Sequence, residues 1–166
     1  MSIEHDYFGV IADDGSGGLR WSDTVEFGDQ SVDVSLSAQS ASAVSEDALL
    51  RAAELLKAIE HFDARARDAM IAGLSQRESV TTSYIDSQVD DLGENLLDLL
   101  VHTSGDIAMD VLRSLQLVRL ALYPEHTRIG EPFAVFDYSL SPDDSDYLLV
   151  VAFDDAGDVV AIDMES

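Results

Sequence analysis

The sequence contains no cysteine, which excludes a disulfide framework, a thiolate nucleophile and cysteine-ligated zinc or iron–sulfur sites. It also lacks an apolar run approaching the ~20 residues that cross a bilayer. Its first residues have neither the basic nor the apolar region of a secretion signal. We therefore expect a soluble, cytoplasmic protein that does not bind membranes.

Cations are scarce: nine Lys and Arg residues stand against 33 Asp and Glu residues, for a formal net charge of -24. With a pI near 4.1, the surface repels phosphate backbones and anionic lipid headgroups, so direct binding to nucleic acid is not expected. Basic proteins and metal ions remain as attractive partners. Genome composition, salt adaptation and a binding face each account for such acidity, and the sequence leaves all three explanations open.

The 166 residues are one domain's worth of chain, and 46% of them are apolar, which is enough for a buried core. Apolar and polar residues alternate over 19–27 and again over 32–36, as they do in half-buried antiparallel strands. Gly28 and Asp29 between these segments fit a two-residue hairpin turn. Together with the short apolar run over 7–12, they predict an N-terminal β-meander.

Helical periodicity replaces this alternation in the middle of the chain. Ser45 fits an N-cap, and the apolar spacing after it predicts helices over 46–60 and 64–73, separated by a kink at His61 and Phe62. A third helical segment carries its apolar stripe at Ile85, Val89, Leu92, Leu96 and Leu100.

A fourth helix is predicted over 106–114, behind Thr103 and Ser104 as a cap. The rest of the chain has the patterns of strands, over 115–123, 133–140, 147–153 and 159–165. The order is therefore strands, helices, strands, without an alternating β-α-β series and so without a doubly wound sheet. We predict a single α+β domain over 1–166, an antiparallel sheet of the N-terminal β-meander and the C-terminal strands, packed on one face by about four helices.

Motifs that carry enzyme chemistry are missing. The sequence has no P-loop, no Gly-x-Gly-x-x-Gly and no Gly-x-Ser-x-Gly, so nucleotide sites and nucleophile elbows lack their local geometry. None of the four histidines has a second histidine four residues away, as a zinc-binding helix needs. The acidic, glycine-rich stretch over 13–18 lacks the ligand spacing of a calcium loop and is expected to be a turn. We expect no catalytic residue, metal site or cofactor.

Two groups of aspartates near the end of the chain are the candidate partner-binding residues. They are Asp137, Asp143, Asp144 and Asp146 around one inter-strand loop, and Asp154 and Asp155 in the next hairpin. If the strands are antiparallel, the two groups lie at opposite ends of the shared strand. One interpretation makes them acceptors for a partner's Arg and Lys side chains, or ligands for a divalent cation. The other makes them turn residues and a solvated edge that resists aggregation.

Roughly the last fifty residues contain four distinctive stretches: LVRLALYPE at 117–125, AVFDYSL at 134–140, DYLLVVAFD at 146–154 and IDMES at 162–166. In these stretches the chain resembles an uncharacterised bacterial family, domain of unknown function two-thousand-four, and it resembles that family more loosely at 25–27 and 83–85. The resemblance implies a small cytosolic bacterial protein and brings no catalytic motif. Relatives of this general type sit among the immunity proteins of toxin systems, which is an association and not a mechanism.

Two functions remain open. The first is a non-enzymatic acidic protein-binding module, similar to a toxin-immunity protein, whose negative face captures a basic partner; a nucleic-acid mimic is a subclass of it. The second is a metal-dependent hydrolase or small-molecule enzyme, with magnesium, calcium or manganese bound by Asp137, Asp143, Asp144 and Asp146. We favour the first, because the charge and the size of the chain support it.

Overall fold

The computed structural model describes residues 2–76, 79–101, 104–143 and 147–165. Within these residues eight strands form one sheet, and their order in space follows their order in the chain. They are β1 (Ile3–His5), β2 (Gly9–Asp13), β3 (Leu19–Phe27), β4 (Gln30–Ala38), β5 (Gln116–Leu122), β6 (Ala134–Ser139), β7 (Leu148–Phe153) and β8 (Val159–Glu165). Neighbouring strands are antiparallel, except that β4 and β5 are parallel.

The β4–β5 pair joins the two halves of the sheet. Its register runs from Asp33 opposite Arg119 to Leu36 opposite Leu122, and the helices lie in the chain between the two strands. Parallel neighbours need such a long crossover, because the chain must return to the end at which the first strand began. The prediction of an α+β fold, with an N-terminal meander and helices against a mostly antiparallel sheet, is confirmed. The parallel pair is the part that strand periodicity did not reveal.

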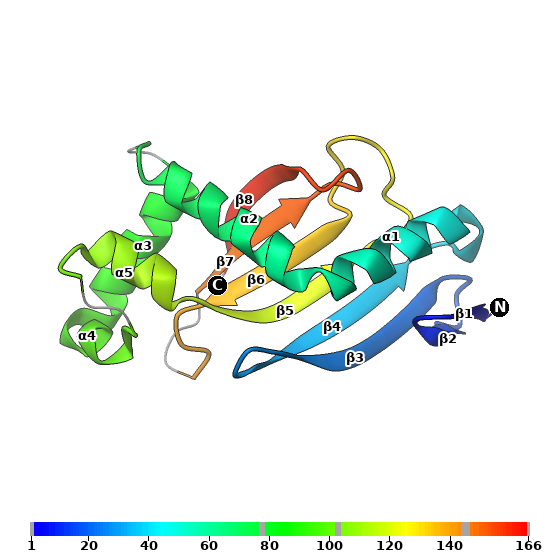
Figure 1. Cartoon of the computed structure of the whole chain (residues 1–166), viewed down its shortest axis with the longest axis horizontal. Coiled ribbons are helices and arrows are strands. Elements are labelled where there is room, and N and C mark those ends of the chain that lie inside the picture. Colours follow the sequence, from blue (N-terminus) through cyan, green and yellow to red (C-terminus); the bar gives the residue numbers. More distant parts are fainter. Residues whose placement is uncertain (1, 77–78, 102–103, 144–146, 166) are drawn as a thin grey trace.

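Helices lie on one face of the sheet and beyond one of its ends (Figure 1). They are α1 (Glu46–Lys57), α2 (Ile59–Gly73), α3 (Val80–Leu92), α4 (Leu96–Leu99) and α5 (Ile107–Ser114). α1 and α2 run across one face, whereas α3, α4 and α5 gather beyond one end. In the described part of the chain four helices have eight residues or more, as predicted, and α4 is a single turn. None of these helices has both the length and the apolar character needed to cross a membrane.

Side-chain caps explain where two of the helices begin. The Ser45 hydroxyl oxygen accepts a hydrogen bond from the Ala48 backbone N–H at 3.1 Å, so the predicted cap of α1 is confirmed. Asp106 caps α5 in the same way, by accepting the Met109 N–H at 3.2 Å. The sequence had predicted Thr103 and Ser104 as the cap of this helix. Ser104 instead donates its hydroxyl to the Asp110 carboxylate, and residue 103 lies outside the described residues.

The breaks between helices differ from the prediction at two places. The predicted kink at His61 and Phe62 lies earlier, at Ala58, which leaves helical conformation with a ψ of 30°. α2 therefore begins at Ile59, and this side chain is buried. The third helical segment is interrupted at Gly93, whose φ of 54° favours a residue without a side chain, and a 3-10 turn leads from there into α4.

The core lies between the sheet and the layer formed by α1 and α2. Phe153 on β7 packs edge-on against Phe62 on α2, with 5.4 Å between ring centroids. Tyr138 on β6 donates its hydroxyl to the Asp63 carboxylate of α2 at 2.7 Å. Arg67 binds the same carboxylate at 3.0 Å and also donates to backbone carbonyls at the end of α5. These contacts fasten both groups of helices to the sheet.

Candidate functional site

The face of the sheet opposite α1 and α2 carries a polar row that crosses six strands. Side chains alternate between the two faces of a sheet, so the strand registers decide which residues share a face. The row consists of Thr24, Asp33, Arg119, Asp137, Val150 and Asp163, one from each strand from β3 to β8. Tyr138, next to Asp137 on β6, points to the other face and donates to Asp63 of α2, so the row lies on the face away from these helices. The row therefore places a cation between carboxylates at the centre of this face.

Asp137 lies within this row, and only 9% of its side chain is exposed. Its Oδ2 atom lies 3.7 Å from Nη1 of Arg119 on the neighbouring strand. Burial raises the pKa of the Asp137 carboxyl to about 6; Arg119 opposes this rise and Glu165 adds to it. Ser139, two residues along on the same face, is fully buried, and its hydroxyl has no hydrogen-bond partner among the described residues. Asp137 is thus a buried carboxylate that its surroundings stabilise poorly.

Asp154 directly follows Phe153, the last residue of β7, and is also buried, with 2% of the residue exposed. Its Oδ1 atom accepts the backbone N–H groups of Ala156 and Asp158 at 3.1 and 3.0 Å. Its Oδ2 atom accepts the N–H of Gly130 at 3.4 Å. These bonds close the predicted turn between β7 and β8 and attach the loop before β6 to it. The Asp154 carboxylate therefore has a structural role.

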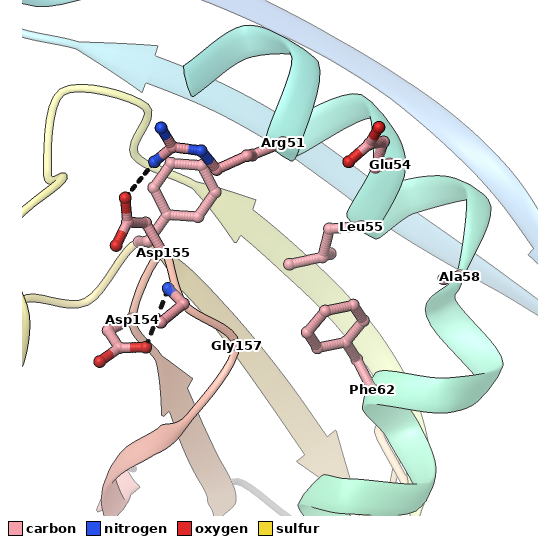
Figure 2. Close-up of a pocket in the computed structure, with 10 residues that line it drawn as sticks. Arg51, Glu54, Leu55, Ala58, Phe62, Asp154, Asp155 and Gly157 are labelled. Carbon is pink, nitrogen blue, oxygen red and sulfur yellow. Dashed lines mark hydrogen bonds and ion pairs between the residues drawn. The ribbon is translucent and has the colours of Figure 1, made fainter. Parts of the chain in front are cut away.

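A pocket of about 250 Å³ lies between this turn and the junction of α1 with α2 (Figure 2). Arg51 on α1 forms an ion pair with Asp155 in the turn. Leu55 and Phe62 give the pocket an apolar wall. Its described lining residues include no Ser, Thr, Lys or His, and their carboxylates are those of Glu54, Asp154 and Asp155. The pocket is an apolar hollow beside the ion pair of Arg51 with Asp155.

The structure does not gather the predicted partner-binding residues into one cluster. Asp143 is exposed in the loop before β7, and Asp144 and Asp146 lie outside the described residues. Asp137 is on the face away from α1 and α2, while Asp154 and Asp155 are in the turn at the far end of β7. The described members thus occupy three separate places, and their part in binding a partner stays a prediction.

Other potential ligands are engaged within the protein. His5 accepts the Tyr7 backbone N–H at 3.1 Å, whereas His102 lies outside the described residues. In the predicted turn over 13–18, Asp14 accepts hydrogen bonds from Ser16, and these hold the pKa of its carboxyl below the usual value. The described ranges contain no group of three or more metal-ligating side chains. The alternative of a metal-dependent hydrolase therefore gains no support from them.

An acidic surface is formed by the described part of residues 79–110, a segment that we call the helical end and that contains no Lys or Arg. Six of its carboxylates belong to exposed residues, namely Asp86, Asp90, Asp91, Glu94, Asp98 and Asp106. Four aliphatic residues are exposed there as well: Val89, Leu97, Val101 and Ile107. The acidic residues of this segment can be read directly from the sequence. No pattern in the sequence distinguished the exposed aliphatic residues from those of the core.

Arg119 and Ser139 are further residues that sequence reasoning missed. Both lie in segments that were predicted as strands, but the prediction did not say which strands are neighbours. Their proximity to Asp137 follows from the register of β5 with β6 and from alternation along β6. Such registers depend on pairings between distant segments, which a single sequence does not display.

Comparisons with known proteins add no relative: a scan against protein-family models, a search of curated proteins and a search of solved structures each find no match. The resemblance to domain of unknown function two-thousand-four stays a prediction. The function is therefore argued from the residues of this chain.

Proposed function

We propose that this chain is a non-enzymatic binding module whose helical end captures a basic protein. The observation that carries the proposal is the composition of that surface, where six exposed acidic residues and four exposed aliphatic residues occur in a segment without Lys or Arg. Carboxylates alone would serve solubility, but they do not account for the aliphatic side chains. A cationic amphipathic segment would complement both kinds of residue.

The distribution of charge supports a directed encounter. In the sequence, α1 and α2 together contain six acidic and four basic residues, so that layer is nearly balanced. The helical end has seven acidic residues and no compensating cation. Between these two surfaces, such asymmetry favours encounter of a positively charged partner with the helical end and raises the association rate at low salt.

The partner is defined by chemistry: a protein that presents Lys or Arg residues together with apolar side chains on one surface. Beside the pocket of Figure 2, Arg51 and Asp155 form an ion pair with one another, which supports a structural role for these two side chains. The immunity role that the resemblance implies is one case of capture of a basic protein, and it stays a prediction.

The test compares two variants that change the net charge equally. The helical-end variant combines Asp90→Asn, Asp91→Asn and Glu94→Gln, and the control variant combines Glu54→Gln, Glu60→Gln and Asp68→Asn, all at exposed positions. The probe is a fluorescent amphipathic peptide of lysine and leucine, and fluorescence anisotropy measures its affinity. We expect the helical-end variant to bind roughly tenfold more weakly at low salt and the control variant to change less than about threefold.

Binding to the unmodified chain must also weaken as salt is added, because the attraction acts between exposed charges. Equal losses in the two variants would show that only total charge matters, and the helical end would be rejected as the site. A peptide of glutamate and leucine provides the charge control. If it bound as well as the lysine peptide, selection of a basic partner would be rejected.

A further inference from the structure

One border of the sheet is largely without a neighbouring strand. β2 pairs with β3 only at Leu19 and Arg20, whereas β3 continues to Phe27 (Figure 1). Among the strands of the described residues, none pairs with 21–27 on the side away from β4. We call residues 21–27 the β3 border. It is long enough for a further strand to pair with it.

Hairpin geometry decides which backbone groups of this border are free. β3 and β4 are joined by a two-residue turn, with a φ of 60° at Gly28, and Phe27 and Gln30 form its closing pair. The closing pair of such a turn exchanges both of its backbone hydrogen bonds. Bonded and non-bonded pairs then alternate along the two strands. The residues that direct their N–H and C=O groups away from β4 are therefore Ser22, Thr24 and Glu26.

A side-chain contact agrees with this orientation. The Thr24 backbone N–H donates to Oδ1 of the adjacent Asp23 at 2.8 Å, and both residues are exposed. A carboxylate that occupies an edge amide and repels other chains is one way in which sheet borders avoid uncontrolled pairing. The bond is replaceable, because an exposed Asp side chain regains hydrogen bonds to water when another acceptor takes its place.

The side chains of the border define the kind of strand that fits. On the side of the helices, Trp21, Val25 and Phe27 are half-buried and pack against the core, which leaves part of each for an apolar neighbour. Asp23 is exposed on that same side, whereas Glu26 is exposed on the other face, and the sequence has no Lys or Arg between positions 21 and 50. An extended segment with alternating basic and apolar residues would meet both features.

From these observations we infer that the β3 border is a strand-addition site for an extended basic segment of a partner protein. A second copy of this chain is a poor occupant, because its own carboxylates at the same border would face those of the first. The inference rests on the proposed function only for the charge of the partner. The surface is a different one from the helical end.

The test uses a short peptide in which lysine alternates with valine, added to the full chain labelled with ¹⁵N. Amide hydrogen exchange, resolved by residue, is measured with and without peptide. We expect exchange at Ser22, Thr24 and Glu26 to slow at least about tenfold, while the amides of Asp23 and Val25, which already bond to β4, stay unchanged. Trp21 is the only tryptophan of the chain, so its fluorescence reports the same event.

Two modified reagents test whether backbone pairing is responsible. Peptide N-methylated at the residues that face β3 must lose binding by more than about tenfold, whereas methylation of the alternate residues must not. In the protein, Thr24→Pro removes an outward N–H without removing a bond to β4 and is expected to weaken binding, while Thr24→Val retains the amide and binding. Should Thr24→Pro fail to fold, the methylated peptides still decide the question.

The outcomes separate this inference from the proposed function. Slowed exchange at the β3 border that persists in the Asp90→Asn, Asp91→Asn, Glu94→Gln variant supports strand addition independently of the helical end. Binding without any change in exchange at Ser22, Thr24 and Glu26 overturns strand addition and leaves the helical end intact. Absence of binding by the alternating peptide, with binding by the amphipathic peptide of lysine and leucine, also overturns it.

Discussion

The turn between β7 and β8 and the β3 border use their polar groups in opposite ways. At the turn, Asp154 accepts three backbone N–H groups, and Arg65 donates to the Gly157 carbonyl at 2.6 Å. At the border, the backbone groups of Ser22 and Glu26 point away from the sheet. Both regions are rich in carboxylates. The comparison teaches that an acidic residue is available to a partner only where the fold has not already used it.

The largest expected effect is at the turn. Asp154→Ala removes the acceptor of three backbone hydrogen bonds at a site that is 2% exposed, so we expect it to lower the free energy of unfolding by about 3 kcal/mol. Urea denaturation followed by circular dichroism measures this loss. Asp154→Asn keeps one acceptor oxygen and should lose about half as much. A loss below about 1 kcal/mol for the alanine variant would show that the hydrogen bonds of Asp154 do not stabilise the fold as expected.

The expected effect at Asp137 is intermediate in size. This carboxylate is buried like that of Asp154, but its surroundings stabilise it poorly. Its folded pKa of about 6 exceeds the ~3.9 of an unfolded chain. The unfolded chain therefore releases this proton first, and the residue's contribution to stability falls as pH rises from about 4 to about 6 and stays low above that. Asp137→Asn cannot ionise, so we expect it to be more stable than the unmodified chain by about 2 kcal/mol at pH 8 and nearly equal at pH 4.

Urea denaturation at the two pH values checks this sign. Asp143→Asn removes an exposed carboxylate from the same part of the chain and is the matched control, with little change expected at either pH. If Asp137→Asn were less stable at pH 8, the ion pair with Arg119 would outweigh the burial of the charge. Asp137 would then belong with Asp154 among the carboxylates that the fold requires.

The smallest effect is expected at the β3 border. Glu26→Gln removes an exposed charge but keeps an acceptor for the Ser31 hydroxyl, which lies 2.9 Å from Glu26 Oε1. Stability should change by less than about 0.5 kcal/mol in the same denaturation assay. The border would prove to be part of the structural framework if this substitution cost as much as Asp154→Asn does.

Local features of the fold were predictable because neighbouring residues determine them. Alternation revealed β3, β4 and β8, apolar runs revealed the other C-terminal strands, and Ser45 marked the start of α1. The parallel pairing of β4 with β5 was not predictable, because it depends on the path of a long crossover. The break at Ala58 was missed for a related reason. This residue ends one helix without the Gly or Pro that usually marks such a place.

The candidate site was harder to predict than the fold. Asp137 and Asp154 look alike in the sequence, since each follows an aromatic residue within an apolar stretch. Their difference arises from the donors around them, which come from Gly130 and the turn in one case and from a distant strand in the other. The free backbone groups of the β3 border likewise follow from the short pairing of β3 with β2. No residue type in the sequence indicates how far two strands pair.

The parallel pair at the centre of the sheet also bears on how the chain assembles. Its paired residues are roughly 90 positions apart, so closing that loop costs about 4 kcal/mol of chain entropy before contacts between the strands offset it. The other pairings close over much shorter loops. The middle of the sheet, where Leu120 and Phe136 are fully buried, is therefore where the entropic cost of assembly is concentrated.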